Sequence, residues 1–159
     1  MIGKHGFKRF LRDGYKTAVE NPNKKHYEPS EIKLFEHIEC EWPMFYAYMV
    51  IDGFFRGDLA KVTYWNDKMT PLLKERADGK VLPRYYYVPI EKVEAERVKP
   101  GSQKRIASDE EVFLWGQSVY IISQLLGESP LLFSLLFVTS LHIFNSLSSS
   151  YSGRNDYDW

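Results

Sequence analysis

The stretch that most constrains this chain is residues 36–58, EHIECEWPMFYAYMVIDGFFRGD, which predicts a buried helix. Within 44–55 the only charged residue is Asp52. A helix that is apolar on nearly every face must be buried on nearly every face. Pro43 suits the first turn of such a helix, because the first backbone N–H groups have no partner inside the helix. We therefore predict an inner helix over 43–55, with the rest of the chain arranged to cover it.

The residues that follow predict a second helix packed against the first. Gly57 suits the left-handed residue that ends a helix, and Asp58 suits the N-cap of the next one. Apolar residues recur at helical spacing through 59–77, which is typical of an amphipathic outer helix. Pro71 predicts a kink or a restart within it. Together the two helices form an αα-hairpin with an inner and an outer member.

A long connection, residues 80–110, separates this pair from a third predicted helix. Within it, residues 91–99 predict a helical turn or two, and we expect the remainder to be a loop. Ser108 and Glu111 have the spacing of a capping box. The helix predicted after them, over 112–126, is again apolar on most faces. The order inner, outer, inner indicates an all-α fold that is part of an alternating helical toroid.

Composition and the start of the chain narrow the class of protein. The 159 residues are 44% hydrophobic and 16% aromatic, which indicates one domain with a real core. Basic and acidic residues balance at 21 each, so the net charge gives no indication that the chain binds nucleic acid. We expect residues 1–30 to be an extended lead-in and 31–39 to form a short helix. The charged start does not resemble a signal peptide.

Metal, cofactor and disulfide chemistry are not expected. The single Cys40 excludes an internal disulfide, fits a reducing, cytoplasmic compartment, and is expected to be a buried apolar residue. The histidines show no metal-ligand spacing, and no phosphate-cradling glycine loop is present. The four histidines are His5, His26, His37 and His142.

The end of the chain has a different character. Residues 131–147 form an uncharged, largely apolar run of 17 residues, followed by a polar, serine-rich end. That length is at the short limit for a membrane span, and His142 and Asn145 weaken the pattern. We predict one domain over 1–128 and an unrelated tail over 129–159, for which a gene-model artefact is one explanation. Membrane attachment through 131–147 stays open as an alternative.

Four runs of sequence resemble a known family. They are EPSEIKLFEHIECEWPMFYAYMVIDGFFRGD (28–58), LPRYYYVP (82–89), PGSQKR (100–105) and LWGQSVYIISQLL (114–126). In this order, across about residues 8–127, they resemble the regulatory α and β subunits of phosphorylase kinase, with the tyrosine-rich run and PGSQKR closer to β. The resemblance implies the C-terminal part of a glucoamylase-like domain (glycoside hydrolase family fifteen), an (α/α)6 toroid. A partial toroid is expected to expose an apolar patch, and pairing of 82–89 into a sheet would contradict the toroid.

The resemblance also implies a function and partners. It implies a non-catalytic scaffold that controls glycogen breakdown through the kinase γ subunit, with the α subunit and calmodulin as further partners and a glucan as a candidate ligand. Relatives of this kind can attach to the plasma membrane through prenylation, but this sequence has no prenylation box. Arg84 stands where glucoamylases have a catalytic glutamate, and a guanidinium cannot act as a base. We expect an inactive glycosidase relative; a working α-glucan hydrolase is the alternative.

Several residues are candidates for binding or modification. Candidates for sugar or partner binding are Glu39, Glu41, Trp42, Tyr85, Tyr86, Tyr87 and Trp115. The two carboxylates have a plainer interpretation as partners of a helix dipole, and the aromatic residues have one as core. Asp52 is expected to pair with Arg56 or a tyrosine hydroxyl. Arg105 lies three residues before Ser108, a weak basophilic-kinase pattern, with helix capping as the alternative.

Overall fold

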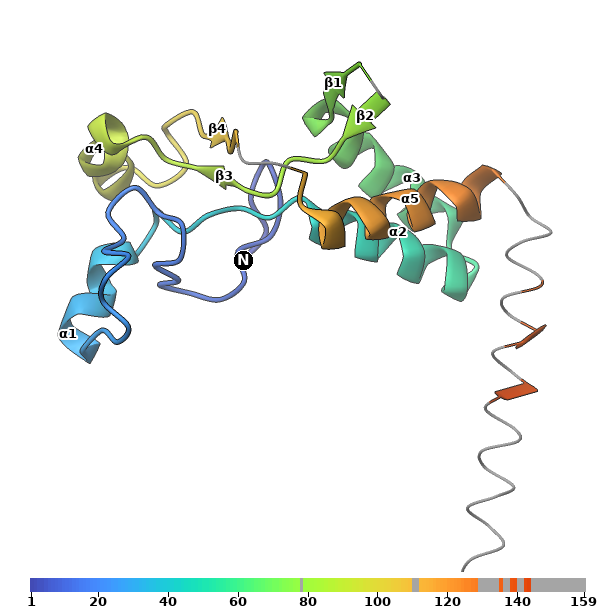
Figure 1. Ribbon diagram of the computed structural model, residues 1–159, viewed down its shortest axis with the longest axis horizontal. Coiled ribbons are helices and arrows are strands. Elements are labelled where there is room, and N and C mark those ends of the chain that lie inside the picture. Colours follow the sequence, from blue (N-terminus) through green and yellow to red (C-terminus); the bar gives the residue numbers. More distant parts are fainter. Residues whose placement is uncertain (78, 110–111, 129–134, 136–137, 140–141, 144–159) are drawn as a thin grey trace, which may run out of the picture.

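The computed structural model describes residues 1–77, 79–109, 112–128, 135, 138–139 and 142–143. Its elements form two groups (Figure 1). One group contains the three longest helices, α2 (Met44–Arg56), α3 (Leu59–Met69) and α5 (Leu114–Glu128). The other contains short elements near the N-terminal segment, including α1 (Pro29–Ile32) and α4 (Val93–Val98).

The predicted inner helix is confirmed as α2. It ends at Gly57, whose φ of 68° is the left-handed conformation that glycine adopts without strain. Asp58 then caps α3, its side chain accepting a hydrogen bond from the Lys61 N–H at 2.9 Å. The sequence signals at this turn therefore predicted both the end of one helix and the start of the next.

Burial of α2 is less complete than its sequence predicts. The helix packs against both α3 and α5, and Tyr46, Ala47 and Val50 are fully buried there. Tyr48 and Phe55 of the same helix are 38% and 44% exposed. Among the described residues, the helices that pack against α2 are α3 and α5, and part of α2 stays exposed at Tyr48 and Phe55.

The outward side of α5 continues this open surface. Trp115 on α5 donates a hydrogen bond from its indole to the Tyr48 hydroxyl at 2.8 Å, so the two helices share one exposed face. Further exposed apolar residues of α5 are Leu114, Ile121, Ile122 and Leu125. The apolar patch expected of a partial helical assembly is therefore present, and we call it the α2–α5 face.

The second helix is shorter than predicted. α3 ends at Met69 and is followed by the 3-10 turn η2 (Thr70–Leu72), so the prediction of helix up to residue 77 is wrong. Pro71 explains the stop, because proline has no N–H for the helical ladder and its ring crowds the preceding turn. A hairpin follows, in which β1 (Lys74–Arg76) pairs antiparallel with β2 (Gly79–Val81).

The connection that was expected to be mostly loop contains paired strands. The predicted helical turns are confirmed as the 3-10 turn η3 (Ile90–Lys92) and α4. However, β3 (Tyr86–Tyr87) pairs antiparallel with β4 (Ile106–Ala107), and Glu41 bridges to Tyr86 on the other side. An all-α fold is thus corrected to a mainly helical one with short strands. The pairing is also the result that counts against the expected toroid.

The N-terminal segment has little regular secondary structure, but it is hydrogen-bonded to the segment that leads into α2. A helical turn, α1 followed by the 3-10 turn η1 (Lys33–Phe35), replaces the short helix expected over 31–39. Phe7 forms an isolated antiparallel bridge with Trp42, which places residues 1–13 against the segment that enters α2. Cys40 is fully buried as expected, and burial raises the pKa of its thiol to about 12.

Two expectations concern the C-terminal region. Among the residues that the structure describes, no helix combines the length and apolar character needed to cross a membrane. Glu111 of the expected capping box and most of 129–159, including most of the 131–147 run, lie outside the described residues. α5 itself begins at Leu114, two residues later than predicted.

Candidate functional site: a buried polar network around Arg105

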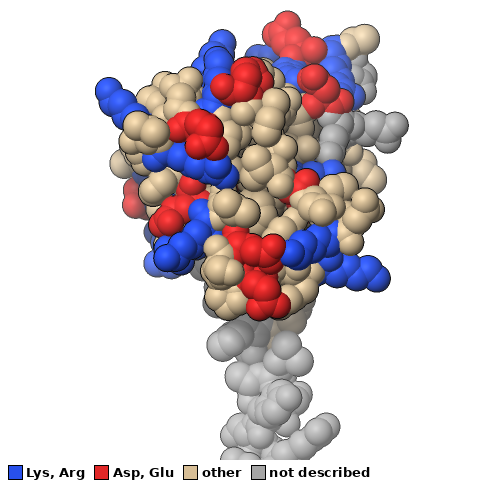
Figure 2. Space-filling view, turned by 90° about the vertical axis from the view of Figure 1, so that its left-hand side faces the viewer, with Lys and Arg blue, Asp and Glu red and all other residues tan. Residues whose placement is uncertain are grey.

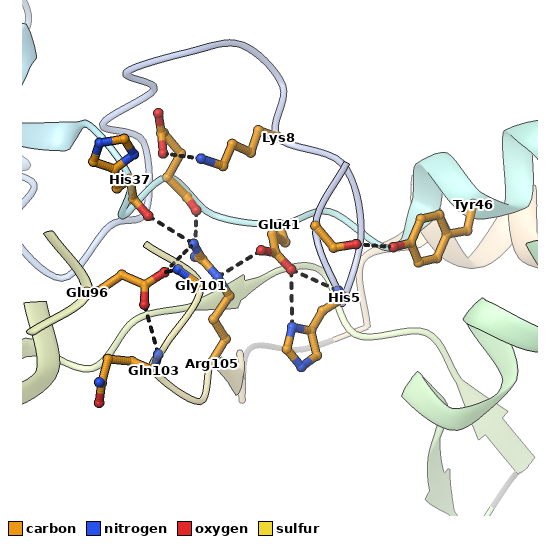
Figure 3. Close-up of polar contacts among 11 residues, drawn as sticks. His5, Lys8, His37, Glu41, Tyr46, Glu96, Gly101, Gln103 and Arg105 are labelled. Atoms are coloured by element: carbon orange, nitrogen blue, oxygen red, sulfur yellow. Dashed lines mark hydrogen bonds and ion pairs between the residues drawn. The ribbon is translucent and has the colours of Figure 1, made fainter. Parts of the chain in front are cut away.

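Arg105 is the centre of a buried network of charged and polar groups (Figure 3). The residue lies just before β4 and is 6% exposed. Its Nε lies 2.9 Å from Glu41 Oε1, its Nη1 donates to the Glu39 carbonyl at 2.6 Å, and its Nη2 donates to the His37 carbonyl at 3.1 Å. One guanidinium thereby holds the whole 37–41 segment that leads into α2.

Glu96 of α4 organises the PGSQKR loop from the other side. Its side chain is almost fully buried at 1% exposure. One oxygen accepts the Gly101 N–H at 2.8 Å and the other accepts the Gln103 N–H at 2.9 Å. The same carboxylate lies 3.7 Å from Arg105 Nη2. The loop therefore wraps around a carboxylate, which positions Arg105 to face the 37–41 segment.

Glu41 joins the network to the N-terminal segment. Its Oε2 accepts the His5 N–H at 2.8 Å and lies 3.1 Å from His5 Nδ1, while the His5 ring stacks on Tyr86 at 4.6 Å. Burial opposes ionisation of Glu41, but the hydrogen bonds from His5 and the charge of Arg105 outweigh it and hold the pKa of Glu41 below its usual 4.5. Glu41 is therefore a charged, fully engaged carboxylate.

Glu39 fastens a second point of the N-terminal segment. Its carboxylate contacts Lys8 Nζ at 2.6 Å and accepts the Arg12 N–H at 2.8 Å. Tyr46 of α2 adds a third point, its hydroxyl donating to the Gly3 carbonyl at 2.6 Å (Figure 3). Burial raises the pKa of Tyr46 to about 12, so that hydroxyl stays protonated.

The structure thus brings together Glu39 and Glu41 of the predicted candidates, but their partners belong to this chain. The carboxylate oxygens contact cations and N–H groups of residues 5–12 and Arg105, and no acidic residue lies in the first turn of α2. The two carboxylates are therefore positioned by these contacts and not by the dipole of α2. Carboxylates held in this way serve to join segments of the chain.

The candidate aromatic residues divide into buried and exposed ones. Trp42 and Tyr85 are 3% and 7% exposed and pack with each other at 5.4 Å, which makes them core residues. Tyr86 is buried and Tyr87 is half-buried in β3. Trp115, at 58% exposure, belongs to the α2–α5 face. The five side chains therefore do not form one sugar-stacking platform.

Arg84 lies among aromatic rings. Its Nη2 donates to the Tyr15 hydroxyl at 2.9 Å, and its guanidinium lies 4.9 Å from the Phe113 ring centroid and 5.9 Å from that of Trp42. Such cation–π contacts stabilise packing. Arg84 remains a permanent cation here and has no geometry for removing a proton from water.

The remaining candidates are Ser108 and Asp52. Ser108 is 6% exposed and bonded to Tyr85, its N–H donating to the Tyr85 carbonyl at 2.9 Å, so its hydroxyl is not displayed to a kinase. Asp52 pairs with Arg56 at 2.9 Å, as predicted, and also with Lys61. Both residues have structural roles in the folded chain.

The network members that were not predicted as site residues include His5, Lys8, Glu96 and, in this role, Arg105. The signal in the sequence was the PGSQKR motif itself, which supplies Gly101, Gln103 and Arg105. Within the described part of the chain, no cluster of three or more histidine, cysteine, aspartate or glutamate residues has the geometry to hold a metal ion. The contacts of the network join groups of this chain to one another, so it can position segments.

Comparison with known proteins identifies relatives of this chain. No protein-family model matches it. It is 46% identical over 127 residues to the phosphorylase b kinase regulatory subunit alpha, liver isoform, of Oryctolagus cuniculus, covering 79% of this chain and 10% of that protein. It is 44% identical over 127 residues to the probable phosphorylase b kinase regulatory subunit alpha of Drosophila melanogaster, with the same coverage.

A third relative extends the match slightly. The probable phosphorylase b kinase regulatory subunit alpha of Caenorhabditis elegans is 41% identical over 133 residues, or 83% of this chain and 11% of that protein. The chain therefore spans about a tenth of the length of these relatives. The family resemblance expected from the four sequence runs is confirmed for most of the chain.

Proposed function

We propose that this chain, about four fifths of which is homologous to a segment of the regulatory α subunits of phosphorylase b kinase, is a non-catalytic regulatory segment acting in glycogen breakdown. The observation that carries the proposal is identity of 41–46% over 79–83% of the chain with proteins that are named regulatory subunits. The charged residues of its motifs bind one another, which supports a scaffold more than a catalytic site.

The proposal takes the α type in preference to the β type. The tyrosine-rich run and PGSQKR favoured β, whereas the relatives named above are α subunits. In the proposal, residues 1–128 are the regulatory unit, 129–159 are a separate tail, and the chain works in the cytoplasm. Its partners are the kinase γ subunit, calmodulin and, since the chain is taken as α type, the β regulatory subunit.

The proposal also treats the chain as a glycosidase relative without activity. Arg84 occupies the place expected for the catalytic base and packs against Tyr15 and Phe113. Glu39 and Glu41 are both buried and engaged by cations of the chain, so neither supports the alternative of a working glucan hydrolase. The toroid remains a prediction, against which the β3–β4 pairing counts.

Co-elution with phosphorylase kinase subunits tests the proposed function. The full chain is mixed with purified γ subunit and calmodulin, with and without the second regulatory subunit, and each mixture is separated by gel filtration. We expect the chain to shift to the elution volume of the kinase subunits and to change the rate at which they phosphorylate phosphorylase b.

An unrelated protein kinase catalytic subunit is the matched control and is expected not to bind. A full-length α subunit run in the same assay shows that the kinase subunits are competent. Free elution of the chain in every mixture, alongside binding of that α subunit, would contradict the proposal.

A further inference from the structure

A cavity of about 490 Å³ opens beside the buried network, between the N-terminal segment, α3 and the PGSQKR loop. Its volume is in the range that holds small ligands. Most of the side chains around it are polar or charged, which suits a polar ligand. The lining residues that matter for recognition are Lys4, Lys68, His37, Gln103, Glu41 and Glu96.

Two lysines in this lining are not used by the network. Lys4 comes from the N-terminal segment and Lys68 from α3, and neither forms an ion pair with any residue that the structure describes. Lys68 lies over the Tyr64 ring at 5.0 Å, a contact with a neutral ring that supplies no carboxylate to the ammonium group. By contrast, Lys8 and Arg105 are paired with buried carboxylates. The cavity therefore has two ammonium groups available to a ligand.

The two carboxylates in the lining do not cancel these lysines. Glu41 is engaged by Arg105 and by two hydrogen bonds from His5, and Glu96 accepts the N–H groups of Gly101 and Gln103. Their lone pairs point to groups inside the network. The unpaired charge at the cavity is consequently positive, although the whole chain has formal charge +0.

The face at the α1 and α4 end of the molecule shows no comparable excess. Acidic and basic side chains are interspersed across it (Figure 2). Surface charges of mixed sign largely compensate each other, especially at physiological salt. An anion is therefore expected to bind more strongly at the cavity than on that face.

We propose that this cavity binds a small phosphate monoester, with Lys4 and Lys68 holding the phosphoryl group. A phosphate monoester carries about −1.5 to −2 charges at neutral pH and presents three strong acceptor oxygens, which matches two ammonium groups. The cavity is larger than a phosphate group, so space remains for a polar organic part beside Gln103 and His37. This inference does not depend on the proposed regulatory function.

Calorimetric titration of the full chain tests the site. The probes are inorganic phosphate and glucose 1-phosphate, titrated at constant ionic strength in potassium chloride so that general screening does not change. We expect saturable binding of both, with glucose 1-phosphate binding more tightly because its sugar fills the remaining space. The Lys4→Gln/Lys68→Gln variant is expected to bind each probe at least tenfold more weakly.

A second double variant separates a site from general charge. Lys25 and Lys33 are exposed and lie outside the cavity, so Lys25→Gln/Lys33→Gln removes the same charge and is expected to change affinity less than twofold. Circular dichroism checks that both variants are folded. Equal weakening in the two variants, sulfate binding as tightly as glucose 1-phosphate, or no saturable binding by the unmodified chain would each overturn the inference.

Discussion

At the scale of single residues, Glu41 shows how buried charge is used in this molecule. The carboxylate is 6% exposed and lies between His5 and the Arg105 guanidinium. A buried ion pair adds little net stability compared with apolar packing, but removing one partner leaves the other charge buried and unpaired. The contribution of Glu41 is therefore to fix which segments come together.

Replacement of Glu41 by glutamine should destabilise the chain in a pH-dependent way. We expect Glu41→Gln to lower the free energy of unfolding by about 2–4 kcal/mol at pH 7, since Arg105 loses the nearer of its two carboxylate partners and keeps only Glu96 at 3.7 Å. Because the folded-state pKa of Glu41 is depressed, its stabilising effect is complete above the unfolded value near 4.5 and is lost as the pH falls through the folded value. Urea unfolding at several pH values between 7 and 3 measures both effects.

Glu36→Gln is the matched control, because Glu36 pairs with Arg12 at a site where both side chains are 41% exposed. Exposed pairs are worth about 0–1 kcal/mol, so this variant should unfold almost as the unmodified chain does. A difference between Glu41→Gln and the unmodified chain that stays constant down to pH 3 would show that the carboxylate charge is not what matters.

The sequence allowed only part of this site to be predicted. Glu39 and Glu41 stood out because they flank Cys40 just before the apolar helix, and their segment does hold them buried. His5 and Lys8 did not, because their partners lie 36 and 31 positions further along the chain. Pairs formed across such separations leave no periodic pattern, so single-sequence reasoning has no local signal for them.

At the scale of elements, the contact between α2 and α3 depends on a glycine. A Cβ atom added to Gly53 would lie 2.8 Å from Val62 Cγ2 and 3.1 Å from the Val62 backbone nitrogen. The absence of a side chain therefore lets the two helices approach closely on either side of the turn at Gly57. Close approach of this kind is a common reason for glycine inside a helix.

Gly53→Ala is expected to destabilise the chain by about 1–2 kcal/mol, because overpacking costs more than the gain in helix propensity. Thermal unfolding followed by circular dichroism measures the change. Gly53→Ala/Val62→Ala relieves part of the contact, so its loss should be smaller than the sum of the two single variants.

Gly127→Ala in α5 is the matched control, since its added Cβ would meet Phe54 at an ordinary 3.4 Å. We expect this variant to be neutral or slightly stabilising. A Gly53→Ala protein that is more stable than the unmodified chain would rule out the close-contact explanation.

Helices and strands differed in how well the sequence predicted them. α2 and the start of α3 were predicted because proline, glycine and aspartate signals stand next to an apolar run. β3 and β4 were missed because each has two residues and they pair across about 20 positions. Strands this short take their stability from the partner, which the local sequence does not reveal.

At the scale of the whole molecule, the network joins two groups of elements that have separate hydrophobic clusters. One cluster is built mainly on α2, α3 and α5, and a smaller one includes Ile38, Val88 and Val93. A third cluster contains Cys40, Trp42 and Tyr85. Between the two groups of elements, Arg105 and its partners hold the N-terminal segment and the PGSQKR loop to the 37–41 segment (Figure 3). The central claim is that these motif residues fasten the segments of the molecule together.

Hydrogen–deuterium exchange of the unmodified chain and of Arg105→Gln tests this claim most directly. We predict slow exchange in the unmodified chain at the amides that carboxylates accept, those of His5, Arg12, Gly101 and Gln103. In Arg105→Gln, exchange should become faster in residues 1–13 and 99–105, whereas α2 and α3 keep their protection.

Arg76→Gln, at an exposed position in β1, serves as the control and should leave the whole pattern unchanged. Faster exchange confined to the two fastened segments of Arg105→Gln is the result that the account predicts. Unchanged protection of those segments in Arg105→Gln would contradict it.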